Sequence, residues 1–199
     1  MEETIESDKL RCFIAISPGA NIVSAISDVQ NRLRRHLTAS PIRWTGMSQW
    51  HLTLRFLGAI ESAQLPAVIA ACQAIAEDSF SFSLILSRLG SFPPRRSPRV
   101  LWLGVKEDAE NLRVLHQEIQ IGTATIGNPP DAGRDFHPHI TLARIKNASL
   151  ALPAWESVVR DMGSLVFESW QVDAFHLVRS HLSPAGASYE TLQTFHLKS

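Results

Sequence analysis

The sequence predicts one domain that mixes α-helices with β-strands in both halves, as α+β and α/β proteins do. Apolar residues recur at helical spacing in some segments and as short continuous or alternating runs in others. The chain has 199 residues, 45% hydrophobic and 19% charged, which suits one compact core. No segment has the length and composition of a linker. Spacing alone does not decide between α+β and α/β.

The first predicted helix, over residues 20–37, shows the helical pattern most clearly. Ile22, Ile26 and Val29 recur at intervals of four and three residues, so they share one face. The second helix is rich in alanine, and Asp108 has a side chain suited to the N-cap of the third. The predicted helices are residues 20–37, 62–77, 108–121 and 153–162.

The predicted strands are short apolar runs bounded by glycine, proline or polar residues. The first run ends at Pro18-Gly19 and the second at Gly58, while the third alternates apolar and polar residues. Residues 1–9 are polar and acidic, and we expect them to form a flexible tail. The predicted strands are residues 10–17, 49–58, 80–89, 100–105, 137–145, 165–179 and 189–197.

The charge balance limits the partners that the protein can have. Nineteen basic and nineteen acidic side chains give a formal net charge of zero. Proteins that wrap long duplex nucleic acid carry a basic excess, because they neutralise many phosphates. Neutrality therefore favours a small footprint, such as one nucleotide or the end of one strand.

The cysteines and the N-terminus indicate in which cellular compartment the protein is expected. Cys12 and Cys72 lie in apolar segments, so we expect buried, reduced thiols. The N-terminus lacks the basic and apolar regions of a signal peptide, and no apolar run approaches the ~20 residues that span a bilayer. We therefore expect a cytoplasmic protein that does not bind membranes.

A four-residue motif occurs twice, once in each half of the chain. His51-Leu52-Thr53-Leu54 is followed 88 positions later by His139-Ile140-Thr141-Leu142. Residues i and i+2 of a strand point to the same face, so each His shares a face with its Thr. The intervening aliphatic residues face the opposite side. Each motif thus predicts a strand with a polar cleft on one side and the core on the other.

If the halves are related by pseudo-symmetry, the two His-Thr faces converge. Cleavage of a phosphodiester needs one group that takes a proton from water and another that protonates the leaving oxygen. Imidazole suits both tasks, because its ordinary pKa lies near ~6.5. Thr53 and Thr141 can donate hydrogen bonds to the phosphate oxygens. This chemistry needs no metal or other cofactor.

Other interpretations remain open at this point. His51 and His139 could be ordinary strand histidines. With His137 they could instead bind zinc, since H-x-H on a strand is a metal-ligand spacing. However, Pro138 intervenes, and no nearby Asp, Glu or Cys completes the set. The cleft could also bind an RNA end or a nucleotide without turnover.

At these residues the sequence resembles the 2H phosphoesterases, which are named for two H-x-[T/S]-hydrophobic motifs. Within that superfamily it is similar to the RNA 2′,3′-cyclic phosphodiesterases, also called 2′-5′ RNA ligases. The resemblance covers nearly the whole chain. It rests on the segments RCFIAIS, IRWTGMSQWHLTLRFLG, PRVLWLGV, FHPHITLAR and LSPAGASYETL.

The resemblance implies an α+β fold with two pseudo-symmetric lobes, each with an antiparallel sheet, in one domain over residues 10–199. It implies hydrolysis of a terminal RNA 2′,3′-cyclic phosphate to a 2′-phosphomonoester, with reversible 2′-5′ ligation as an alternative. His51 is then the proton donor, His139 the proton acceptor, and Thr53 and Thr141 the phosphate ligands. The expected partners are RNA 3′ ends or small 2′,3′-cyclic nucleotides, bound by a monomer without an obligate protein partner.

Two arginines are further candidates for contact with the phosphate. The resemblance points to Arg144, which follows the second motif. Strict alternation, however, puts Arg144 on the face opposite His139, unless the strand bulges. The same count places Arg55 on the face of His51 and Phe56 on the core side.

Overall fold

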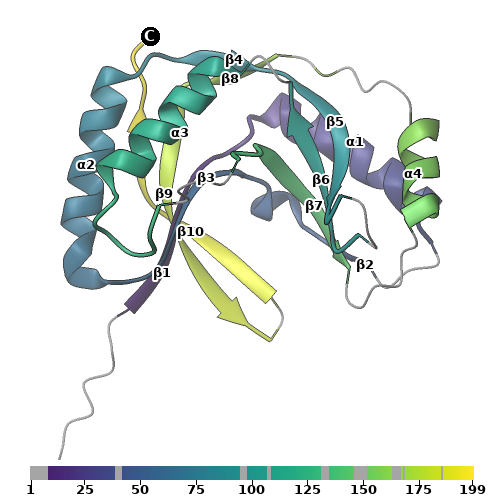
Figure 1. The fold of residues 1–199 in the computed structure, drawn as a ribbon, viewed down its shortest axis with the longest axis horizontal. Coiled ribbons are helices and arrows are strands. Elements are labelled where there is room, and N and C mark those ends of the chain that lie inside the picture. Colours follow the sequence, from purple (N-terminus) through teal and green to yellow (C-terminus); the bar gives the residue numbers. More distant parts are fainter. Residues whose placement is uncertain are drawn as a thin grey trace, which may run out of the picture.

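The structure is a computed structural model in which helices and strands alternate along the chain (Figure 1). It describes residues 9–38, 42–94, 98–106, 109–130, 135–145, 152–162, 167, 169–184 and 186–199. The elements are β1 (Lys9–Ile16), α1 (Ala20–His36), β2 (Ile42–Trp44), η1 (Met47–Gln49), β3 (Leu52–Glu61), η2 (Ser62–Gln64), α2 (Leu65–Asp78), β4 (Phe82–Leu84), β5 (Leu86–Phe92), β6 (Val100–Val105), α3 (Glu110–Gly122), β7 (His139–Ile145), α4 (Leu152–Asp161), β8 (Trp170–Val172), β9 (Ala174–Ser183) and β10 (Gly186–His196). Of the predicted tail, only Lys9 is described; it begins β1 and pairs with Glu61.

The strands form one large antiparallel sheet and a small second one. The large sheet runs in the order β10-β9-β1-β3-β7-β6-β5, with β2 also paired to β7, and β4 pairs with β8 in the small sheet. Helices α2 and α3 lie beside the half formed by β10, β9, β1 and β3, and α1 and α4 lie beside the other half (Figure 1). The predicted α+β fold with two antiparallel lobes is confirmed.

The core lies between the sheet and the helices. Ile22, Ile26 and Val29 of α1 are buried, as the helical pattern predicted. The two cysteines, Cys12 of β1 and Cys72 of α2, are buried free thiols, also as predicted. Apolar burial against the sheet is the main term that holds the helices in place.

Several strand boundaries differ from the prediction. β3 does not end at Gly58 but continues to Glu61, because Gly58 adopts a positive φ of 74° inside an irregular stretch of the strand. The predicted strand 80–89 is divided between β4 and β5, which belong to different sheets. Likewise, the predicted strand 165–179 covers β8 and the first part of β9, which continues to Ser183. A change of pairing partner breaks these runs, and an apolar pattern does not reveal it.

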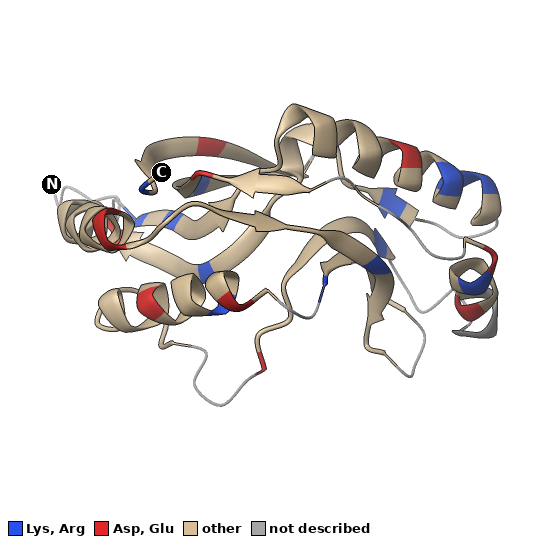
Figure 2. Ribbon diagram, turned by 90° about the horizontal axis from the view of Figure 1, so that it is seen from above, with Lys and Arg blue, Asp and Glu red and all other residues tan. Residues whose placement is uncertain are grey.

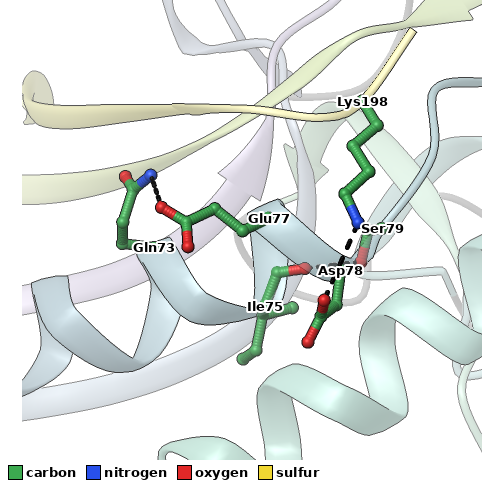
Figure 3. A network of polar contacts seen from close by, with 6 residues as sticks. All are labelled: Gln73, Ile75, Glu77, Asp78, Ser79 and Lys198. Atoms are coloured by element: carbon green, nitrogen blue, oxygen red, sulfur yellow. Dashed lines mark hydrogen bonds and ion pairs between the residues drawn. The ribbon is translucent and has the colours of Figure 1, made fainter.

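The C-terminal residues are held against the end of α2 (Figure 3). The amide of Lys198 donates to the carbonyl of Ser79 at 2.9 Å, and its Nζ lies 3.7 Å from Asp78 Oδ1. Ser79 Oγ donates to the carbonyl of Ile75 at 2.8 Å. These contacts anchor the segment that follows β10 to the end of α2.

Charged residues of both signs are interspersed over the helices and strands (Figure 2), in keeping with the formal net charge of zero. No helix in the described part of the chain is long and apolar enough to cross a membrane.

Candidate active site

The two motifs meet at the centre of the large sheet. Leu52 of β3 pairs with Ile140 of β7 in the antiparallel sense. These residues occupy the same position in the two motifs, so a pseudo-twofold axis passes between them. We call the side that carries His51, Thr53, His139 and Thr141 the histidine face. The pairing of β3 with β7 therefore brings the two motifs together, as predicted.

Each motif ends in a β-bulge at its leucine. Thr53 pairs with Ala15 and Arg55 with Ile14, so Leu54 is an extra residue in β3. Thr141 pairs with Trp102 and Ala143 with Leu101, which leaves Leu142 as the extra residue in β7. A bulge reverses the alternation of all the residues that follow it.

The expectation that Arg55 shares the histidine face is wrong, because the bulge turns its side chain towards α3. Arg55 is only 2% exposed. Its Nη1 donates to Gln120 Oε1 at 2.9 Å, and its Nη2 donates to the carbonyl of Asn128 at 2.9 Å. Arg55 therefore binds the polar groups at and beyond the end of α3. Phe56, expected in the core, is instead 56% exposed and packs against Phe13 on the histidine face.

The second bulge turns Arg144 towards the histidines. The register after the bulge puts Arg144 on the histidine face, where its positive charge adds to burial in lowering the pKa of His51 and of His139. Arg144 is exposed, and it forms no hydrogen bond or ion pair with another residue of the described ranges. The bulge resolves the conflict between strict alternation and the position expected for Arg144.

A buried glutamine supports each bulge. Gln30 of α1 donates from Nε2 to the carbonyl of Leu142 at 3.0 Å, and Gln120 of α3 donates to the carbonyl of Leu54 at 3.2 Å. The hydroxyl of Thr45 adds a bond of 2.8 Å to the carbonyl of Leu142. The sequence analysis did not single out Gln30, Gln120 or Thr45. For the two glutamines, a polar side chain on the buried face of an amphipathic helix could have indicated such a role.

The two imidazoles are held in the same way. His51 Nδ1 lies 2.8 Å from the carbonyl oxygen of Gln49, and His139 Nδ1 lies 2.7 Å from that of His137. A carbonyl only accepts hydrogen bonds, so each Nδ1 carries the proton and donates it. Each Nε2 of a neutral ring is then an acceptor.

Burial keeps both rings neutral in the free protein. Loss of water contact is the largest influence on His51, and it outweighs the Gln49 hydrogen bond; together with the charges of His139 and Arg144 it lowers the pKa to about 4. The pKa of His139 is also lowered, chiefly by burial and in part by Arg144 and His137. At neutral pH both Nε2 atoms can therefore accept a proton.

Aromatic rings flank each histidine in a matching arrangement. The His51 ring lies 4.8 Å from Phe13 and 5.2 Å, edge to face, from Tyr189. The His139 ring lies 6.0 Å from Trp102 and 5.2 Å, edge to face, from Phe92. These rings pack against the imidazoles and limit their orientations. The two motifs do not single out Phe13, Phe92 or Trp102 as neighbours of the histidines.

The two threonines complete the histidine face. Thr53 and Thr141 are partly exposed, and neither hydroxyl is hydrogen-bonded to another described residue. Both can therefore donate to a bound anion.

The structure also has two cavities, of about 480 and 400 Å³. The first lies between α2 and α3, and the second is lined in part by Trp102 and α4. Neither of these two cavities is lined by His51, His139, Thr53 or Thr141.

No group of three or more His, Cys, Asp and Glu among the described residues is placed to hold a metal ion. His51, His137 and His139 are all described, so the three-histidine zinc site considered from the sequence does not form. His137 instead contributes its backbone carbonyl, which accepts the hydrogen bond from His139.

The model of the LigT-like phosphoesterase family matches the chain twice, over residues 16–102 and 103–189. The chain belongs to this family. The two matches together cover most of the chain, and each contains one of the motifs. The family resemblance found in the sequence is thus confirmed, and so is the internal duplication.

Several relatives of the family are similar over most of their length. An RNA 2′,3′-cyclic phosphodiesterase from Aquifex aeolicus is 32% identical over 87% of this chain and 92% of its own. One from Aeropyrum pernix is 35% identical over 78% of this chain and 86% of its own. The crystal structure of Escherichia coli LigT complexed with 3′-AMP matches with a TM-score of 0.76 and 26% identity, covering 96% of this chain and 99% of LigT.

Proposed function

We propose that this family member hydrolyses the terminal 2′,3′-cyclic phosphate of RNA to a 2′-phosphomonoester. The observation that carries the proposal is the matched pair of histidines, each with Nδ1 bound to a carbonyl and each next to a threonine with a free hydroxyl. The names of the relatives and the 3′-AMP complex of LigT support this substrate class. Binding alone would not require two imidazoles held in the same tautomer.

The reaction assigns one proton transfer to each histidine. His139 Nε2 takes a proton from water, and the water oxygen forms a bond to phosphorus as the bond to the 3′ oxygen breaks. His51, protonated at Nε2, gives its proton to that oxygen. Thr53, Thr141 and Arg144 donate hydrogen bonds to the non-bridging oxygens, on which charge accumulates. The products are a 2′-phosphate and a 3′-hydroxyl.

The lowered pKa of His51 makes its protonation depend on the substrate. In the free protein burial disfavours the charged ring. A bound phosphate anion favours the imidazolium, because opposite charges raise the pKa of a base. His51 therefore takes up its proton together with the substrate.

A product assay tests the proposal. An oligonucleotide that ends in a 2′,3′-cyclic phosphate is incubated with the protein, and the product is identified as the 2′- or 3′-phosphate. We expect the 2′-phosphate, and a loss of at least 10²-fold in rate for His51→Ala and for His139→Ala. Full activity in the double variant, or release of the 3′-phosphate, would contradict the proposal. Binding without turnover would favour a binding module instead.

We also infer that residues 10–199 act as one domain and that the protein works as a monomer in the cytoplasm. The buried reduced thiols of Cys12 and Cys72 suit a reducing compartment. Small 2′,3′-cyclic nucleotides present the same phosphate as RNA 3′ ends and are included in the proposed substrate class.

A further inference from the structure

Two arginines lie directly opposite each other across neighbouring strands. Arg43 of β2 pairs with Arg144 of β7. Residues directly opposite in an antiparallel pair project to the same face. Trp44, the next residue of β2, faces the other side, where Arg34 of α1 lies over its ring. Arg43 is therefore on the histidine face, as Arg144 is.

The pairing places two arginine side chains on one face at the edge of the site. Both side chains are exposed. Two positive charges on one face attract anions, and arginine recognises phosphate with paired hydrogen bonds.

The side chain of Arg43 is held against the tip of the β9–β10 hairpin. A β-carbon on Gly186 would overlap Arg43 Nη2, so the glycine leaves the space that the guanidinium fills. Next to it, Gln49 Nε2 donates to the carbonyl of Ala187 at 2.6 Å. The same hairpin carries Tyr189, whose ring packs against His51. Arg43 therefore has a defined position relative to the catalytic histidines.

We propose that Arg43 binds the phosphate on the 5′ side of the reacting nucleotide, next to the cyclic phosphate held by Arg144. This inference rests on the proposed function. Arg144 is near both histidines and serves the reacting phosphate, whereas Arg43 is one strand, about 5 Å, farther away. The next anion along an RNA chain is the 5′-phosphate of the same nucleotide. The preferred substrates are accordingly oligonucleotides or 5′-phosphorylated cyclic nucleotides.

Arg88 is the alternative location for such a subsite. It lies over the ring of Trp102 at 5.9 Å, on the His139 side of the histidine face. An RNA chain that runs in the other direction would bring its 5′-phosphate towards Arg88. The Arg43 position is favoured because Arg43 adjoins Arg144 directly, and because Gly186 holds it in place.

The test compares three substrates: adenosine 2′,3′-cyclic phosphate, its 5′-phosphorylated form, and the dinucleotide ApA with a 2′,3′-cyclic end. We expect Arg43→Ala to lower kcat/KM about tenfold or more on the two substrates with a 5′-phosphate, as for loss of a charge-assisted hydrogen bond. On the first substrate the change should be less than about threefold. Arg43→Lys should retain part of the preference, and Arg35→Ala, an exposed change on α1, is the matched control.

Equal loss on all three substrates would contradict the subsite, because it would mean that Arg43 only positions the hairpin. A selective loss in Arg88→Ala and none in Arg43→Ala would also contradict it. Affinities of 2′-AMP and of ApA with a 2′-phosphate give a second readout that needs no turnover; Arg43→Ala should weaken only the dinucleotide. A wild-type protein that turns over none of the substrates would contradict the proposed function, while the affinities would still decide on the subsite.

Discussion

At the scale of single residues, the chemistry depends on where two imidazoles hold their protons. Nδ1 of each ring is bound to a backbone carbonyl two residues earlier, which leaves Nε2 for the substrate. Burial by aromatic neighbours lowers the pKa of both rings. The proposed mechanism needs one of the two rings to be protonated, so it couples proton uptake to substrate binding.

The lowered pKa of His51 has a consequence for stability. Between pH 6.5 and about 4 the unfolded chain binds a proton at this residue that the folded protein does not. Stability therefore falls as the pH drops through this window, by at most about 3.5 kcal/mol for His51, since one pKa unit corresponds to ~1.4 kcal/mol. We expect urea unfolding of His51→Asn to depend less on pH in this window than that of the wild type. If the stability of both proteins depended equally on pH, the lowered pKa of His51 would be contradicted.

Arg55 and Arg144 should respond oppositely to the same substitution. We expect Arg144→Met to lower kcat/KM about 10²-fold with a stability change within about 0.5 kcal/mol, because its exposed charge serves the phosphate. Arg55→Met should lower the free energy of unfolding by about 3 kcal/mol, because it removes a buried donor from Gln120 and several carbonyls. Its activity per folded molecule should fall much less than that of Arg144→Met, because Arg55 acts on the site only through Gln120. Denaturant unfolding and steady-state kinetics on both variants check this prediction.

The sequence singled out His51, His139, Thr53 and Thr141 because their pattern repeats at strand spacing. Strict alternation put Arg55 and Arg144 on the wrong faces, because a bulge depends on pairing with a neighbouring strand and leaves no mark in one motif read alone. Only the family resemblance pointed to Arg144 as a candidate on the histidine face.

At the scale of elements, each catalytic strand is supported by a helix that carries a buried glutamine. α1 supports the bulge of β7 and α3 supports that of β3. The apolar faces of these helices were predictable from their periodicity. The strand that each helix supports was not predictable, because periodicity identifies a buried face and not the strand that this face contacts.

Gln30→Leu and Gln120→Leu should each lose stability and activity together. Each change leaves the carbonyl of a bulge leucine with fewer donors in the core, which should lower the free energy of unfolding by about 1–3 kcal/mol. A shifted bulge would also misplace the adjacent Thr and His, so kcat should fall. Gln73→Leu, which loses only an exposed bond to Glu77, is the control. Variants that match this control would contradict the supporting role.

At the scale of the whole molecule, the site exists because two similar halves pair at one point. Leu52 and Ile140 join β3 to β7, and each lobe contributes one histidine and one threonine. The duplication and the mixed fold were both visible in the sequence. The division of strands between two sheets was not visible, because the pairing of β4 with β8 joins residues as far apart in the chain as Ser83 and Gln171.

The assembled site should work without a metal ion. We expect hydrolysis to proceed at an unchanged rate in excess EDTA, because both proton transfers are assigned to imidazoles. A loss of activity that added Zn²⁺ or Mg²⁺ restores would contradict that assignment.

The most direct test of paired imidazole catalysis is the pH profile of kcat/KM on a 2′,3′-cyclic nucleotide, measured in EDTA. We expect a bell centred below pH 6.5, because burial lowers the pKa of both histidines in the free protein. His139→Ala should lose the acidic limb, which reports protonation of the base, and His51→Ala should lose the alkaline limb. A flat profile from pH 4 to 8, or a bell that both variants retain, would contradict the two-histidine mechanism.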